Sequence, residues 1–290
     1  MKLKYFNSEQ LYWLAEFGRS RRKISVDELK RNLHLIESPV FFLSTGRTGT
    51  QWFARLFSFA KGIKAYHAPA PDLASQNCYA YRIQKEASLS REARDEILGH
   101  IFLAGREQYL RYAYKCKRRY LETNNHITFF AYAIARLLPQ ASFVHVHRHP
   151  GDFASSGLKR RWYENDPTAI RQIVPVEASA SGSWQGLNPL QKIGWLWKET
   201  NEFIEDFKAS VPAERVFTFN FSSMNPETLK ELLVFTGAEI SASKINSLMG
   251  RKLNDQQFQA SEKYKSWSSQ DKEELAEICR PLAAKYGYTL

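Results

Sequence analysis

The sequence predicts an α/β fold in three layers, in which a central parallel sheet is covered by helices on both faces. Short apolar runs that suit buried strands alternate with longer segments of helical periodicity through most of the chain. Two of these runs, at residues 40–43 and 143–147, each lead through a tight turn into a helix, at 50–59 and 150–161. Because parallel strands end at one edge of a sheet, both turns should face the same ligand crevice.

The remaining elements follow from periodicity and from turn residues. Strands are expected at 63–66, around 120–122 and at 215–221. The segment 163–190 is rich in Ser, Gly and Pro and is expected to be a flexible loop or lid. Pro281 is expected to kink or split the last helix. Further helices are expected at 8–17, 26–36, 88–117, 129–138, 190–207, 226–236 and 270–285.

Length and charge limit the domain organisation and the partners. The chain has 290 residues and is 43% hydrophobic, which suits one large domain over 1–290 with a helical extension at 1–37. A net charge of +11 favours an anionic partner, such as a phosphorylated cofactor, an acidic glycan, nucleic acid or a membrane surface. The charge alone does not choose among these classes.

Cysteine content and hydropathy bear on the compartment. The three cysteines are scattered and form no Cys-x-x-Cys pair, so neither a disulfide framework nor a zinc knuckle is indicated. No apolar run approaches the roughly 18 residues of a membrane span, and the N-terminus turns polar too soon for a signal peptide. A cytoplasmic location is the expectation, with peripheral membrane contact left open.

The first turn, at residues 45–49, has the composition of an anion site. Gly46 and Gly49 allow the backbone to come close to an anion, and Arg47 supplies a full charge and a planar fork of donors. The N-terminus of the following helix adds unpaired N–H groups and partial positive charge. The alternative is a plain strand-to-helix turn that carries a surface arginine.

This loop differs from the loop of ATP- and GTP-binding proteins. The triphosphatase pattern has Gly, Lys and Ser or Thr where this chain has Ser44, Thr50 and Gln51. Failure at three positions predicts a loop built for fewer phosphates.

The second turn repeats the arrangement. Arg148 lies where strand meets helix, Pro150 suits the first helical turn, and Ser156 follows Arg148 by eight residues. Three alternating histidines also lie here, for which packing in the sheet is expected rather than metal binding: His145, His147 and His149.

Two residues at strand ends are candidates for a general base. His67 follows the strand at 63–66, and Glu122 ends the strand around 120–122. An imidazole or a carboxylate in the crevice can accept a proton from a substrate hydroxyl. The alternatives are a loop histidine without a role and a carboxylate that anchors a neighbouring backbone.

The two turns together resemble those of sulfotransferases that use 3′-phosphoadenosine 5′-phosphosulfate. The segment 45–52 resembles the family's loop for the 5′-phosphosulfate, and Arg148 with Ser156 resembles its 3′-phosphate site. The likeness runs from about residue 38 to the C-terminus and is weakest at 60–115 and 163–190. It implies a P-loop-like nucleotide-binding fold with a central parallel sheet of about five strands, adenosine 3′,5′-bisphosphate as a product, and no required metal.

The resemblance also implies roles for single residues. Arg47 would steady charge on the leaving phosphate, and Trp52 would lie against the adenine. Arg251 would be a third contact for the nucleotide, although Leu253 stands where the family has Gly. Asn124 stands near the place where many cytosolic members carry a histidine, which leaves Glu122 and His67 as rival bases. The implied nucleotide-binding residues are Thr45, Gly46, Arg47, Thr48, Gly49, Thr50, Gln51, Trp52, Arg148, Ser156 and Arg251.

The implied reaction is transfer of a sulfuryl group to a hydroxyl or amine of a carbohydrate, glycolipid or other small molecule. No nucleic-acid partner is expected, and the oligomeric state is left open. One rival is a P-loop small-molecule kinase, which needs the missing Lys and a magnesium site. The other is a non-catalytic module that binds polyanions through spread positive charge.

Overall fold

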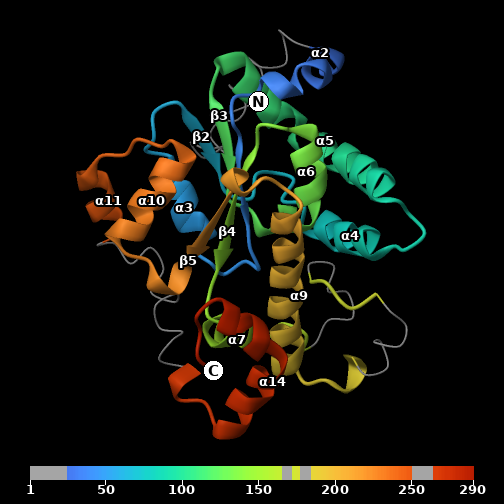
Figure 1. Ribbon diagram of the computed structural model, residues 1–290, viewed down its shortest axis with the longest axis vertical. Coiled ribbons are helices and arrows are strands. Elements are labelled where there is room, and N and C mark those ends of the chain that lie inside the picture. Colours follow the sequence, from blue (N-terminus) through green and yellow to red (C-terminus); the bar gives the residue numbers. More distant parts are fainter. Residues whose placement is uncertain (1–24, 165–171, 177–183, 250–263) are drawn as a thin grey trace, which may run out of the picture.

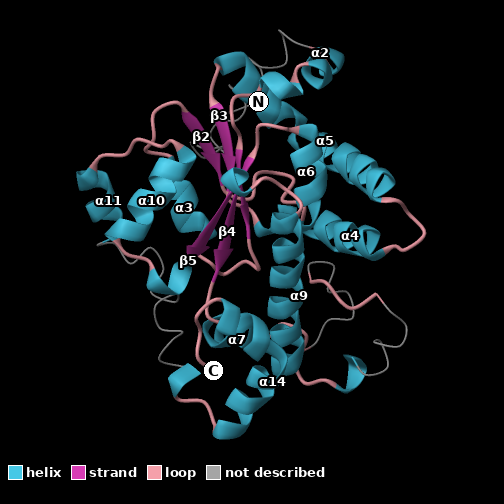
Figure 2. Cartoon of the chain, viewed as in Figure 1, coloured by secondary structure: helices cyan, strands magenta, loops and turns pink. Residues whose placement is uncertain are grey.

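The computed structural model describes residues 25–164, 172–176, 184–249 and 264–290. Within them a five-stranded parallel sheet has the order β2-β3-β1-β4-β5, with helices on both sides (Figures 1 and 2). The predicted α/β fold with a central parallel sheet is therefore confirmed. The strands are β1 (Val40–Leu43), β2 (Ile63–Tyr66), β3 (Arg119–Glu122), β4 (Ser142–His147) and β5 (Val216–Asn220).

The register of the sheet brings three strand ends together. The central strand β1 pairs with β3 on one side and with β4 on the other. Phe41 lies opposite Glu122, and Leu43 lies opposite His145. The segments that leave the carboxyl ends of β1, β3 and β4 are consequently neighbours.

Helices cover the two faces of the sheet as separate layers (Figure 1). None of the helices in the described residues is long and apolar enough to cross a membrane. The α-helices are α2 (Val26–Arg31), α3 (Thr50–Phe57), α4 (Ala74–Lys85), α5 (Arg91–Cys116), α6 (Ala131–Leu137), α7 (Pro150–Leu158), α9 (Pro189–Ala209), α10 (Pro226–Thr236), α11 (Ala242–Met249) and α14 (Ser269–Lys285). Short 3-10 helices are η2 (Leu33–Leu35), η3 (Asn125–Phe130), η4 (Ala213–Arg215) and η5 (Phe221–Ser223).

Alternate residues of β1 are buried in opposite layers, as the two-residue period of a strand requires. Phe42 packs against Phe53 and Phe57 of α3, at ring-centroid distances of 5.2 and 5.7 Å. Phe41 packs on the other face against Phe102 of α5 and Phe143 of β4, at 5.9 and 6.0 Å. Because both faces of β1 are buried, its four residues are all apolar, and the short run was recognisable in the sequence.

Most expected elements form, but helices α4 and α11 were not among them, and α14 differs from expectation. Helix α4 was not predicted, because its buried positions include polar residues and Leu73 before it is no ordinary N-cap. Helix α14 contains Pro281 and is not split. Its buried face packs on α9, where the Cys279 thiol lies 3.5 Å from the Gly194 carbonyl oxygen, and this packing outweighs the one hydrogen bond that proline removes. The helix expected at 8–17 lies outside the described residues.

Candidate functional site

The loop between β1 and α3 has an unusual backbone. Gly46, Arg47 and Gly49 all have positive φ, at 82°, 56° and 72°. A Cβ on Gly49 would stand 2.3 Å from the Phe221 ring, so only glycine fits there. Thr128 anchors the start of the loop, because its hydroxyl accepts the N–H of Ser44 at 3.1 Å and donates to the Ser44 carbonyl at 3.0 Å. The loop is thus shaped in advance as a cradle at the N-terminus of α3.

The two predicted turns meet through their side chains. Arg47 Nε donates to the Ser156 hydroxyl at 3.1 Å, and Arg148 Nη1 donates to the Arg47 carbonyl at 2.9 Å. Arg160, which the sequence analysis did not single out, donates to the same Ser156 hydroxyl at 3.0 Å. We call Arg47, Arg148, Arg160 and Ser156 the arginine cluster. The sign of Arg160 in the sequence was its position one helical turn after Ser156.

The arginine cluster carries concentrated positive charge. Partial burial, followed by repulsion from Arg160 and Arg148, lowers the pKa of Arg47 to about 10. Burial also lowers the pKa of Arg148, although Asp152, with Oδ2 3.7 Å from Arg148 Nε, works against that shift. A guanidinium with a lowered pKa gains from any anion that arrives beside it.

Other residues of the loop lie as follows. Thr48 is fully buried, and its hydroxyl has no hydrogen-bond partner among the described residues. Thr45 and Thr50 are buried, and Gln51 is exposed. Trp52 is buried beside Phe53 in an edge-on contact at 5.3 Å between ring centroids.

Glu122 is held in a buried ion pair. Arg106 of α5 donates to both of its carboxylate oxygens, at 2.9 and 2.7 Å, and neither side chain is exposed to solvent. Tyr120 and Asn124 also donate to this carboxylate, at 2.5 and 3.0 Å. Burial disfavours the charge on Arg106, but the Glu122 carboxylate outweighs it, and the net effect raises the pKa of Arg106. This geometry favours the structural anchor of the two roles considered for Glu122.

His67 is exposed at the end of β2. Its Nδ1 lies 2.9 Å from the Thr123 carbonyl oxygen. Because a carbonyl only accepts, this contact requires a proton on Nδ1 and leaves the lone pair on Nε2. The Thr123 hydroxyl donates in turn to the Thr50 carbonyl at 2.7 Å, which ties the segment to the start of α3.

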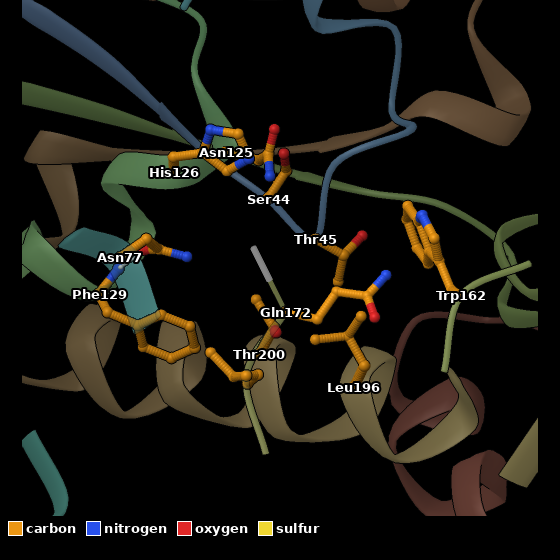
Figure 3. A pocket seen from close by; sticks show the side chains of 11 residues that line it. Ser44, Thr45, Asn77, Asn125, His126, Phe129, Trp162, Gln172, Leu196 and Thr200 are labelled. Carbon is orange, nitrogen blue, oxygen red and sulfur yellow. Dashed lines mark hydrogen bonds between the residues drawn. The ribbon is translucent and has the colours of Figure 1, made fainter. Parts of the chain in front are cut away.

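A pocket of about 180 Å³ opens beside the loop (Figure 3). Ser44 and Thr45 of the loop form one part of its wall, and Asn125 and His126 of η3 form another. Sequence reasoning missed this pocket, because its other walls come from distant parts of the chain. They are Asn77, Phe129, Trp162, Gln172, Ile173, Leu196 and Thr200.

The remaining predicted residues are placed only in part. Arg251 and much of 163–190 lie outside the described residues. The His145 ring is fully buried and pairs with the Asn201 side chain at 2.9 Å. The His147 ring stacks on Tyr286 at 4.2 Å, and His149 caps α7. Within the described residues, no three His, Cys, Asp or Glu side chains are grouped as a metal ion would need.

Comparisons with known proteins bear on the family to which the chain belongs. The model of the family described as "Sulfotransferase family" matches residues 39–241. A search of curated proteins found none that matches the chain.

Three solved structures share the fold. The sulfotransferase domain from the curacin biosynthetic pathway has a TM-score of 0.55 and 13% identity, over 88% of this chain and 99% of that one. The sulfotransferase domain of the Synechococcus PCC 7002 olefin synthase has 0.52 and 16%, over 88% and 97%. Sulfotransferase STF9 from Mycobacterium avium has 0.51 and 12%, over 95% and 84%. With the family match over residues 39–241, which is more than half of its length, the chain belongs to the sulfotransferase family.

Proposed function

We propose that this protein transfers a sulfuryl group from 3′-phosphoadenosine 5′-phosphosulfate to a hydroxyl or amine of a small-molecule acceptor. The observation that carries the proposal is the arginine cluster, in which two anion-binding turns from distant parts of the sequence share Ser156. A donor with phosphates at both ends of a ribose needs two such turns close together. A loop for one polyphosphate chain would need only one of them.

The residues fit the donor in the following way. The backbone N–H groups of 46–51 and the N-terminus of α3 would hold the 5′-phosphate. Arg148 and Ser156 would hold the 3′-phosphate, and Trp52 would lie against the adenine. Arg47 lies between the two sites and would stabilise the charge that grows on the leaving phosphate.

The proton of the acceptor would go to His67. Its Nε2 lone pair is the basic position, because Nδ1 donates to Thr123. As the acceptor oxygen bonds to sulfur and the bond from sulfur to the phosphate oxygen breaks, Nε2 takes the acceptor proton. A positioned base of this kind contributes about 10²–10⁴ in rate. We set Glu122 aside, because its carboxylate is fully buried and its oxygens already accept from Arg106 and two further donors.

Calorimetric titration with adenosine 3′,5′-bisphosphate, 5′-AMP and ATP in EDTA tests the donor. We expect the bisphosphate to bind tightest, since each charged hydrogen bond to a phosphate is worth about 1.5–3 kcal/mol. Ser156→Ala should weaken the bisphosphate about ten- to a hundred-fold and leave 5′-AMP nearly unchanged. Arg148→Ala also removes the hydrogen bond to the Arg47 carbonyl, so it should weaken both ligands, and the bisphosphate more strongly. Arg280→Ala, which removes an exposed arginine of α14, is the matched control. Tighter binding of ATP, or a need for magnesium, would contradict the proposed donor and favour the kinase interpretation.

The same titration distinguishes the proposed sulfotransferase from a polyanion-binding module. Such a module would bind heparin with a steep salt dependence and would show no preference between the bisphosphate and 5′-AMP.

The role of His67 as the general base is tested by turnover with labelled donor. His67→Gln should lower kcat about 10²–10⁴-fold without changing the affinity for the bisphosphate. A His67→Gln enzyme with wild-type kcat would eliminate this residue as the base.

A further inference from the structure

The pocket of Figure 3 lies against the loop that the proposed function assigns to the donor. Ser44 and Thr45 belong to both the loop and the pocket wall. Asn125 closes the gap, since its Cγ lies 3.0 Å from the position that a Cβ on Gly46 would occupy. Asn125 also follows Thr123, the hydrogen-bond partner of His67, by only two residues. A molecule in the pocket therefore lies against the loop that the proposed function assigns to the donor, two residues along the chain from the partner of His67.

The chemistry of the lining is polar but carries little charge. Side-chain amides come from Asn77, Asn125 and Gln172, and hydroxyls come from Ser44, Thr45 and Thr200. Among the described residues that line the pocket, none is Asp, Glu, Lys or Arg. This composition contrasts with the net charge of +11 for the whole chain. The excess of positive charge therefore lies outside the pocket lining, in part in the arginine cluster.

One of these polar side chains directs hydrogen-bonding capacity at the pocket. The Asn77 carbonyl oxygen accepts the N–H of Phe129 at 3.5 Å, and its amide nitrogen points into the pocket in Figure 3. The Thr200 hydroxyl, by contrast, is closed off from solvent and has no hydrogen-bond partner among the described residues. A ligand that supplies hydroxyl groups would give the Asn77 amide nitrogen an acceptor.

The size and the apolar walls limit the ligand further. A volume of about 180 Å³ is below the ~300–1,000 Å³ of pockets for whole drug-sized molecules, so it accommodates about one ring. Trp162 and Phe129 add aromatic carbon to the lining, which suits the C–H surface of such a ring. While the ring of His126 in the lining is neutral, a carboxylate or sulfate in the pocket would be desolvated without a cationic partner from the described lining. A plain phenol would leave most of the amides and hydroxyls unpaired.

We propose that this pocket is the acceptor subsite and that it takes one uncharged ring with several hydroxyl groups, of the class of a neutral monosaccharide unit. The proposal rests on the proposed function, because it takes the loop as the donor site. It excludes acidic sugars and simple phenols as the group that enters the pocket.

Calorimetry in saturating adenosine 3′,5′-bisphosphate tests this without turnover. The probes are the methyl glycosides of glucose, galactose and mannose, the corresponding methyl uronosides, and phenol. The titrations are made at pH 8, above the range in which histidines ordinarily titrate. We expect at least one neutral glycoside to bind about ten-fold or more tightly than its uronoside and than phenol. Asn77→Leu should weaken that glycoside about ten-fold, since the hydrogen bond from the side-chain amide is lost.

Asn246→Leu is the matched control, because Asn246 is exposed on α11 and does not line the pocket. It should leave glycoside binding unchanged, and both variants should bind the bisphosphate like the wild type. Preference for a uronoside or for phenol, or failure of every neutral glycoside to bind while the bisphosphate binds, would overturn the inference and leave the proposed function intact. Failure of the bisphosphate itself to bind would instead remove the proposed function and this inference with it.

Discussion

Replacing Glu122 by Gln tests directly which role the carboxylate has. Glu122 and Arg106 are both fully buried and joined by two hydrogen bonds of 2.9 and 2.7 Å. Gln keeps the shape but removes the charge, and it turns an amide NH₂ towards donors that need an acceptor. Removing one partner of a buried ion pair costs about 3–5 kcal/mol, because the remaining charge is left uncompensated. We therefore expect Glu122→Gln to lower the free energy of unfolding by about that amount.

Urea unfolding followed by circular dichroism measures the change. The matched control is Glu273→Gln, because Glu273 pairs with Arg280 at 2.9 Å but both side chains are more than half exposed. The control should change stability by less than about 1 kcal/mol. The double replacement of Arg106 and Glu122 by Met should recover much of the loss, since apolar substitutes for a buried pair are often neutral.

A different pattern would refute this reasoning. If Glu122→Gln unfolds within about 1 kcal/mol of the wild type, the pair is not a structural anchor of the strength expected from its burial. If kcat then falls by about 10² or more with unchanged affinity for the bisphosphate, Glu122 would be the base in place of His67.

Two predictions concern pH. The charged form of Arg47 binds phosphate, so affinity for the bisphosphate should fall as pH rises through its pKa of about 10, by about four-fold between pH 8.5 and 10.5. Arg47→Gln should lack this part of the decrease in calorimetry, and an identical pH profile would contradict the assignment. Burial, with a smaller effect of His145, lowers the pKa of His147 to about 3, so the folded state keeps it neutral while the unfolded state takes up a proton below about 6.5. The free energy of unfolding should therefore decrease by about 2 kcal/mol from this residue between pH 7 and 5. In urea unfolding, His147→Gln should lose less stability over this range than the wild type. An equal loss in both proteins would contradict the prediction and show that the folded state protonates His147.

The sequence was sufficient for the elements whose signal is local. The strands at 40–43 and 63–66 have the predicted bounds. At 40–43 a short apolar run bounded by turn residues is visible without knowledge of its neighbours. Pro150 marked the beginning of α7 for the same local reason. Helix α4 was not predicted from the sequence, because its packing on η3 and α5 stabilises it rather than its own residue pattern.

Residue types and their order determined the two anion-binding turns, since glycines at a strand end and an arginine before a helix are local chemistry. Only the tertiary structure brought Arg47 within hydrogen-bonding distance of Ser156, across 109 residues, and so completed the arginine cluster. It also set the role of Glu122, because its partner Arg106 lies on a helix and reaches it only when α5 packs on β3. The neutral pocket is likewise a product of packing, as its walls come from six separate segments. A sequence records which groups are present, whereas burial and distance decide which of them carry charge, take a proton or meet a ligand.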